Sequence, residues 1–201
     1  MLAGRTDAGV HAVGQVAALD IDWAHDASSL RDALNAGLPA DLVVIDAQPA
    51  REAFHPRFDA VARRYRYDVR CAPLRHPLED RLAWRVWPPV RIADLNRAAR
   101  LLVGIHDFGG FGSPAQKGGG TTRSVEASEW TSDRAVCHYH IVADGFLYRM
   151  VRRLVCVQVA VGQGKCPEQV LRDALERGRR VPGLPAGTAP AEGLTLLEVK
   201  Y

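Results

Sequence analysis

An aspartate flanked by small residues and preceded by an arginine stands near the start of the chain, in G-R-T-D-A-G-V-H (residues 4–11). Glycines let a backbone turn sharply and approach a partner closely, so this loop is expected to present Asp7 at the surface. An ionised aspartate can attack an anomeric sugar carbon or an electron-poor ring carbon. An ordinary turn, with Asp7 bonding its own backbone, would also explain an isolated Asp-Ala-Gly.

A second segment, A-R-R-Y-R-Y-D-V (residues 62–69), alternates large side chains at a period of two, which predicts a strand. One face of the strand then carries Arg64, Arg66 and Asp68, and the other carries Arg63, Tyr65, Tyr67 and Val69. Basic residues interleaved with aromatic ones suit a sugar-phosphate chain with unstacked bases. An exposed strand whose arginine stems lie along its surface would give the same pattern.

A third segment, G-F-L-Y-R-M-V-R (residues 145–152), ends in Arg152. A carboxylate paired with an arginine stays ionised, and a tyrosine beside it can stack on a flat ring or move a proton. Asp7, Tyr65 and Arg152 are therefore the candidate catalytic residues. Taken singly, Arg152 could form a surface ion pair worth under about 1 kcal/mol, and Tyr65 could be a half-buried strand residue.

The overall composition favours a globular chain with a sizeable core, because 47% of its 201 residues are hydrophobic. No apolar run approaches the roughly 18 residues of a membrane helix, and no basic-then-apolar leader opens the chain, so a cytoplasmic location without membrane contact is expected. The four cysteines lie far apart, without a C-x-x-C motif. His138 and His140 share a strand face without an obvious third ligand, so no metal site is expected.

The basic residues are mostly arginines, since only three of the 26 are lysines, and the net charge is +3. Arginine's planar fork suits phosphates and base edges, although a compositional bias of the whole proteome would have the same effect. The glycine run 118–120 lacks a following G-K-[ST], so a nucleotide-phosphate loop is not indicated.

The first part of the chain predicts a strand at residues 13–21 and a helix capped by Ser28 or Ser29 that ends at Gly37. A buried strand at residues 42–45 follows in this prediction. The later part predicts strands at 82–87, 125–130, 135–143 and 195–199, helices at 94–103, 146–161 and after Pro167, and a glycine-rich loop at 109–120.

This second order of elements is that of a split β-α-β, or ferredoxin-like, unit. The first part shows the same order without an opening strand and helix. The expected fold is therefore α+β, with two ferredoxin-like halves sharing a mostly antiparallel sheet. Residues 1–58 would form the shortened first half and residues 59–201 the second half.

Five motifs then identify a family. The sequence resembles the tRNA pseudouridine synthase A family in G-R-T-D-A-G-V-H-A (4–12), F-H-P-R-F-D-A-V-A-R-R-Y-R-Y (54–67), H-D-F (106–108), G-F-L-Y-R-M-V-R (145–152) and A-P-A-E-G-L-T-L (189–196). The motifs occur in the family's order and extend over the whole chain.

The resemblance implies an isomerase that converts uridine to pseudouridine at positions 38 to 40, in the anticodon stem-loop of tRNA. It implies no cofactor or metal, and a homodimer that holds tRNA in a cleft. By motif position, Asp7 matches the nucleophile, Arg5 the arginine that flips the target base out, Tyr65 the tyrosine stacking on the flipped uracil, and Arg152 the partner of the aspartate. Arg64 and Phe146 are expected to be further substrate contacts.

The resemblance also predicts a difference, because the family carries a further segment before the G-R-T-D motif, with a strand, a helix and a Y-D-G-x-x-x-x-G-W-Q-like motif. Cys156 stands where the family commonly has glycine. A second hypothesis is therefore a truncated, inactive RNA-binding module, in which the basic and aromatic surface persists but Asp7 is poorly held. A third is a nucleosidase, which would need a second acid that the sequence does not obviously supply.

Overall fold

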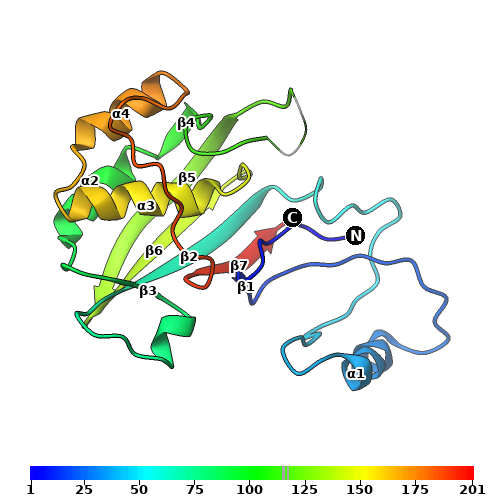
Figure 1. Ribbon diagram of the computed structural model, residues 1–201. Coiled ribbons are helices and arrows are strands. Elements are labelled where there is room, and N and C mark those ends of the chain that lie inside the picture. The colour runs from blue at the N-terminus through cyan, green and yellow to red at the C-terminus, as the bar shows by residue number, and fades with distance from the viewer. Residues whose placement is uncertain (115, 117) are drawn as a thin grey trace.

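The computed structural model describes residues 1–114, 116 and 118–201. One mixed sheet forms its centre (Figure 1), with strand order β1-β7-β2-β6-β5-β4 and with β3 paired to β2. The strands are β1 (His11–Ala12), β2 (Ala62–Cys71), β3 (Trp84–Val86), β4 (Gly104–Asp107), β5 (Thr122–Asp133), β6 (Val136–Ala143) and β7 (Leu194–Lys200). The pairs β1–β7 and β2–β3 are parallel, and the other pairs are antiparallel.

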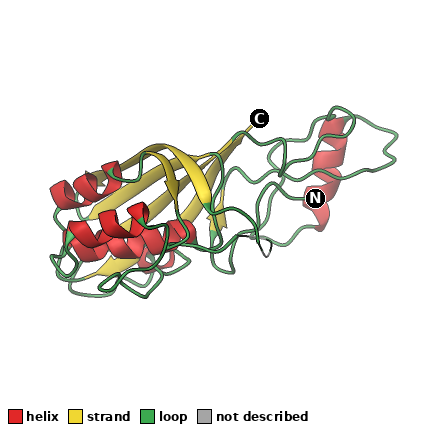
Figure 2. Cartoon of the chain, turned by 90° about the horizontal axis from the view of Figure 1, so that it is seen from above, coloured by secondary structure: helices red, strands yellow, loops and turns green. Residues whose placement is uncertain are grey.

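The helices are α1 (Ala27–Gly37), α2 (Ile92–Arg100), α3 (Met150–Gly162) and α4 (Glu168–Glu176), with a short 3-10 helix η1 (Glu79–Arg81). Three of them, α2, α3 and α4, cover one face of the sheet, and α1 stands apart from it (Figures 1 and 2). The core lies between this face and the three helices, where Tyr67, Tyr139, Leu95 and Leu154 are fully buried. None of the described helices combines the length and apolar character needed to cross a bilayer.

The predicted mixed α+β architecture around a mostly antiparallel sheet is confirmed. The strand at 62–69, the hairpin of β5 and β6, the helix after Pro167 and the closing strand all form close to their predicted bounds. In β6 the side chains alternate between buried and partly exposed positions, as a strand with one covered face requires. Helix α3 carries the predicted apolar stripe, but it begins at Met150.

Two predicted strands in the first part of the chain were wrong. Residues 13–21 form no strand, and β1 ends before them. The Val13 N–H still donates to the Leu196 carbonyl of β7, but residues 16–18 then pair with residues 1–3 through an isolated bridge between Leu2 and Ala17. Residues 42–45 form no strand, and the side chains of Leu42, Val43 and Ile45 are largely exposed. The Asn35 side chain of α1 bonds both the backbone N–H and the carbonyl of Val44, which takes the groups that a strand ladder would use.

Smaller differences concern element ends and one added strand. Asp26, and not Ser28 or Ser29, caps α1, because its carboxylate accepts the Ser29 N–H at 2.7 Å. The H-D-F motif lies partly in β4, an unpredicted edge strand paired with β5. Of the predicted glycine-rich loop, residues 115 and 117 lie outside the described residues, and the rest forms turns and irregular backbone.

The glycine of the fifth motif has a packing role. A Cβ atom at Gly193 would lie 2.6 Å from Cζ of the fully buried Tyr67, whose hydroxyl donates to the Pro190 carbonyl at 2.8 Å. The segment before β7 therefore approaches β2 closely enough to exclude any larger residue.

We expect Gly193→Ala to lower the free energy of unfolding by about 1–3 kcal/mol, because an added methyl overpacks the Tyr67 ring. Urea unfolding followed by circular dichroism would measure the change. Gly120→Ala is the matched control, since a Cβ there meets nothing within 4 Å. Equal midpoints for the two variants would contradict this account of Gly193.

Candidate active site

The loop that carries Asp7 is held at both ends. Gln15 clamps its start, because its amide donates to the Gly4 carbonyl at 3.0 Å and accepts from the Gly4 N–H at 3.3 Å. A turn closes the loop where the Val10 N–H donates to the Asp7 carbonyl, and Gly9 adopts a positive φ of 82° within it. The chain then enters β1 beside β7, so the loop is fixed relative to the sheet.

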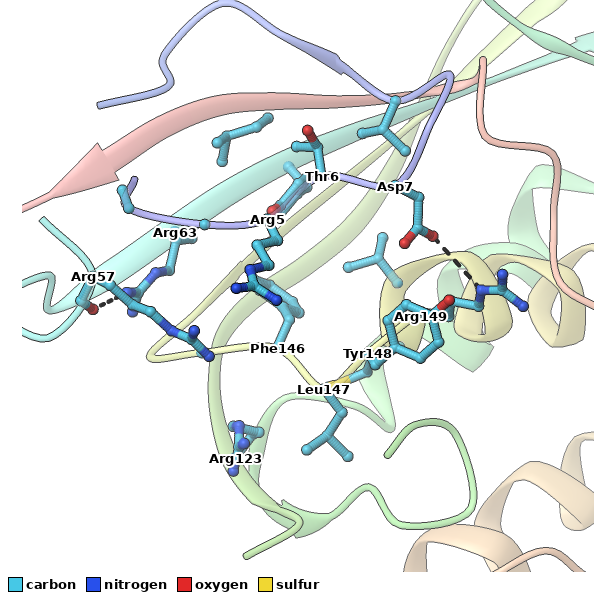
Figure 3. A pocket seen from close by; sticks show the side chains of 18 of the residues that line it. Arg5, Thr6, Asp7, Arg57, Arg63, Arg123, Phe146, Leu147, Tyr148 and Arg149 are labelled. Carbon is cyan, nitrogen blue, oxygen red and sulfur yellow. Dashed lines mark hydrogen bonds and ion pairs between the residues drawn. The ribbon is translucent and has the colours of Figure 1, made fainter. Parts of the chain in front are cut away.

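The carboxylate of Asp7 forms an ion pair with the first turn of α3 (Figure 3). Arg152 Nη1 donates to Asp7 Oδ2 at 2.5 Å, and Arg152 Nε donates to the Ala189 carbonyl at 2.8 Å. The Asp7 side chain is 23% exposed and that of Arg152 is 13% exposed. A helix N-terminus also attracts negative charge. The charge of Asp7 is thus balanced by its surroundings, while its side chain stays exposed enough to reach a ligand.

Arg149 is a second cation at this carboxylate, with Nε 3.8 Å from Asp7 Oδ2. It occupies the N-cap position of α3 with φ of 61°, an uncommon left-handed conformation for a residue with a side chain. Its guanidinium lies 4.8 Å from the centroid of the Tyr148 ring. The backbone at this corner thus directs two arginines of one motif toward Asp7.

Tyr65 lines the same cavity from β2. Its ring meets Phe146 edge to face, with centroids 5.1 Å apart. Burial raises the pKa of the Tyr65 phenol above its ordinary value, and the charge of Asp7 raises it further, against the lowering effect of Arg63. The phenol is therefore protonated at neutral pH and can donate a hydrogen bond or a proton.

The cavity has a volume of about 1020 Å³ and is lined by all but one of the predicted site residues. Asp7, Tyr65, Arg152, Arg5 and Phe146 all contribute to its wall. They come from the N-terminal loop, β2, α3 and the segment before α3, which are far apart in the sequence.

Arg64 is the exception. It is exposed on β2 and lies outside the described cavity lining, whereas its neighbour Arg63 lines the cavity with Tyr65. Successive strand residues face opposite sides of a sheet, so Arg64 and Tyr65 cannot share a face. The alternation of residues 62–69 in the sequence already placed Arg64 and Tyr65 on opposite faces of the strand.

Sequence reasoning missed three further arginines of the cavity wall, namely Arg57, Arg123 and Arg149. Arg57 and Arg149 lie inside quoted motifs, but nothing in their spacing indicated where they point. Among the described lining residues, six arginines face two aspartates, Asp7 and Asp144. Such a lining suits an anionic ligand and offers little to a metal cation.

The arrangement as a whole presents an ionised carboxylate, a protonated phenol and an excess of guanidinium groups in one open cavity. A carboxylate of this kind can attack carbon, and a flat ring can pack against Tyr65 while arginines bind the negative charge of the same ligand. The site is therefore suited to covalent chemistry on a polyanion that carries flat rings.

Comparison with known proteins agrees with this arrangement. A family model described as tRNA pseudouridine synthase matches residues 98–201. The tRNA pseudouridine synthase A of Geobacter sulfurreducens is 40% identical over 202 residues, which cover 99% of this chain and 81% of the relative. Those of Geobacillus kaustophilus and Syntrophotalea carbinolica are 40% and 38% identical, each over 99% of this chain and over 76% and 78% of their own length. These matches extend over almost the whole chain and include the segments that carry the site residues. The chain therefore belongs to the tRNA pseudouridine synthase A family, a family of isomerases.

Proposed function

We propose that this protein converts uridine to pseudouridine in the anticodon stem-loop of tRNA, at positions 38 to 40, with Asp7 as the nucleophile. The observation that carries the proposal is the Asp7–Arg152 ion pair, which lies in one cavity with Tyr65 and Phe146. The named relatives supply the substrate class.

The first step is removal of the target uridine from its stack, because a base inside a stem is out of reach of the cavity. Extrusion costs a few kcal/mol, and a side chain that fills the gap offsets part of this cost. Arg5 is suited to that role, since it is exposed, lines the cavity and stands two residues before Asp7. Tyr65 and Phe146 would then hold the everted uracil, with Tyr65 stacked on it.

The chemical steps rearrange one nucleotide without adding or removing atoms. Asp7 attacks either the sugar C1′ or a ring carbon, and the bond between C1′ and N1 breaks. The uracil rotates and C5 bonds to C1′. The bond between Asp7 and carbon breaks, either as C5 displaces the carboxylate from C1′ or as the carboxylate is eliminated from the ring, and C5 loses its proton while N1 gains one. Arg152 holds the carboxylate in position for the attack, and the Tyr65 phenol, which lines the same cavity, can take part in proton transfer. No cofactor, metal or external donor enters this scheme.

Three finer features belong to the same proposal. The sheet would consist of two ferredoxin-like halves, residues 1–58 and 59–201, and the protein would act in the cytoplasm as a homodimer. The exposed apolar side chains of Leu42, Val43 and Ile45, between 57% and 71% exposed, favour self-association. Sedimentation equilibrium that fits a monomer at micromolar concentration would rule out the dimer.

We expect Asp7→Asn to abolish pseudouridine formation, because a neutral amide cannot attack carbon as a carboxylate does. Tritium release from tRNA labelled at C5 of uridine measures the reaction. Asp144→Asn, which neutralises the other carboxylate of the cavity wall, is the matched control and should retain activity.

Tritium release that survives Asp7→Asn would refute the assigned nucleophile. Binding of tRNA by the unaltered chain without any release would instead favour the non-catalytic RNA-binding module.

We expect Tyr65→Phe to preserve tRNA affinity and to slow turnover by about 10²-fold, the lower end of what a proton-transferring side chain contributes. Single-turnover rates at saturating tRNA, together with equilibrium binding, separate the two effects. Tyr65→Ala should in addition weaken binding by about 1–3 kcal/mol through lost stacking. A single-turnover rate for Tyr65→Phe equal to that of the unaltered chain would argue against a role for the hydroxyl.

A further inference from the structure

The cavity wall has two differently charged ends. Asp7 and its arginine partners lie at one end, whereas Arg5 and Arg57 lie toward the other end and Arg123 lies below them in the view of Figure 3. The arginines near Asp7 are neutralised in part by its carboxylate. At the second end the carboxylate in the wall is Asp144, whose Oδ1 accepts the Ser124 N–H.

Arg57 presents an unused guanidinium to this end of the cavity. Its side chain is exposed, lies 5.9 Å from the centroid of the Phe58 ring, and forms no hydrogen bond or ion pair with any described residue. Its backbone carbonyl, by contrast, is held by Arg63, which also donates to the carbonyls of Ala60 and Asp144. Arg63 thus uses its charge to fix the segment that carries Arg57.

Arg123 reaches the same end from the beginning of β5. Its Nη1 donates to the carbonyls of Gly120 and Thr122, which fixes the position of the guanidinium. Its Nε and Nη2 have no hydrogen-bonding partner among the described residues. The Arg123 guanidinium is therefore fixed by its own hydrogen bonds, the Arg57 guanidinium extends from a segment held by its backbone, and both line one cavity with donors left free.

Like charges gathered in this way repel each other, and the repulsion is relieved when an anion binds between them. A guanidinium presents a planar fork of N–H donors that matches the oxygens of a phosphate, and two such forks can bind one bridging phosphodiester. A metal cation would be repelled. Phosphodiester is also the anionic group that repeats along an RNA strand.

We propose that Arg57 and Arg123 form a phosphate clamp, which binds a backbone phosphodiester of the RNA strand whose uridine occupies the Asp7 end of the cavity. The clamp rests on the proposed function, because that function places an RNA strand in the cavity. By holding this phosphate, the clamp determines how deeply the RNA strand enters the cavity. It thereby determines which nucleotide lies against Asp7.

The test is the salt dependence of binding to an unmodified tRNA transcript, measured by fluorescence anisotropy. Each lost phosphate contact lowers the slope of log K against log salt concentration by about 0.7 for single strands and about 0.9 for duplex. Because the two arginines of the clamp bind one phosphodiester, the double variant Arg57→Gln/Arg123→Gln should lower the slope by about 0.7 to 0.9. Arg57→Lys/Arg123→Lys keeps both charges and should restore it.

Arg100→Gln/Arg172→Gln is the matched control, because it removes the same charge from exposed positions on α2 and α4. Its slope should equal that of the unaltered chain. An unchanged slope for the Arg57/Arg123 glutamine variant, or a lowered slope that the lysine variant fails to restore, would overturn the clamp. Binding and tritium release are separate measurements, so absence of tritium release would refute the proposed function while leaving the clamp testable.

Discussion

The ion pair between Asp7 and Arg152 is the interaction on which the rest of the site depends. It joins a loop at the beginning of the chain to the first turn of α3, and the same guanidinium bonds the Ala189 carbonyl in the segment that leads into β7. Because the pair is only partly buried, its charges retain some hydration, and the carboxylate stays open to a ligand. One arginine thus joins three segments and fixes the position of the reactive carboxylate.

The central sheet makes this contact possible. Strand β7 pairs with β2 on one side and, through a short parallel pairing, with β1 on the other. The N-terminal loop that leads into β1 therefore lies near β2, the strand that carries Tyr65. Helix α3 packs over the same sheet (Figure 1), and its first residues, Met150 to Arg152, line the cavity. The close passage of Gly193 against Tyr67 brings the β7 segment near enough for Ala189 to meet Arg152.

Arginines in the cavity divide into groups with different tasks. Arg152 and Arg149 face the carboxylate, Arg63 is occupied by backbone carbonyls, and Arg57 and Arg123 keep donors free. The net charge of +3 gives no hint of this distribution, since it averages over the whole surface. The cavity suits a polyanion because positive charge is in local excess there, on arginines that backbone contacts help to position.

The sequence by itself determined the family, the main strands and helices of the second part, and the identity of Asp7, Tyr65 and Arg152 as candidates, because these depend on motifs and on local periodicity. Only the tertiary structure decided that residues 42–45 stay outside the sheet, because Asn35 of α1 takes the backbone groups of Val44. It likewise decided that Arg63, and not Arg64, lines the cavity, and that Arg57 and Arg123 line it together. These outcomes depend on contacts between segments that are far apart in the sequence. The local pattern of residue types contains no information about such contacts.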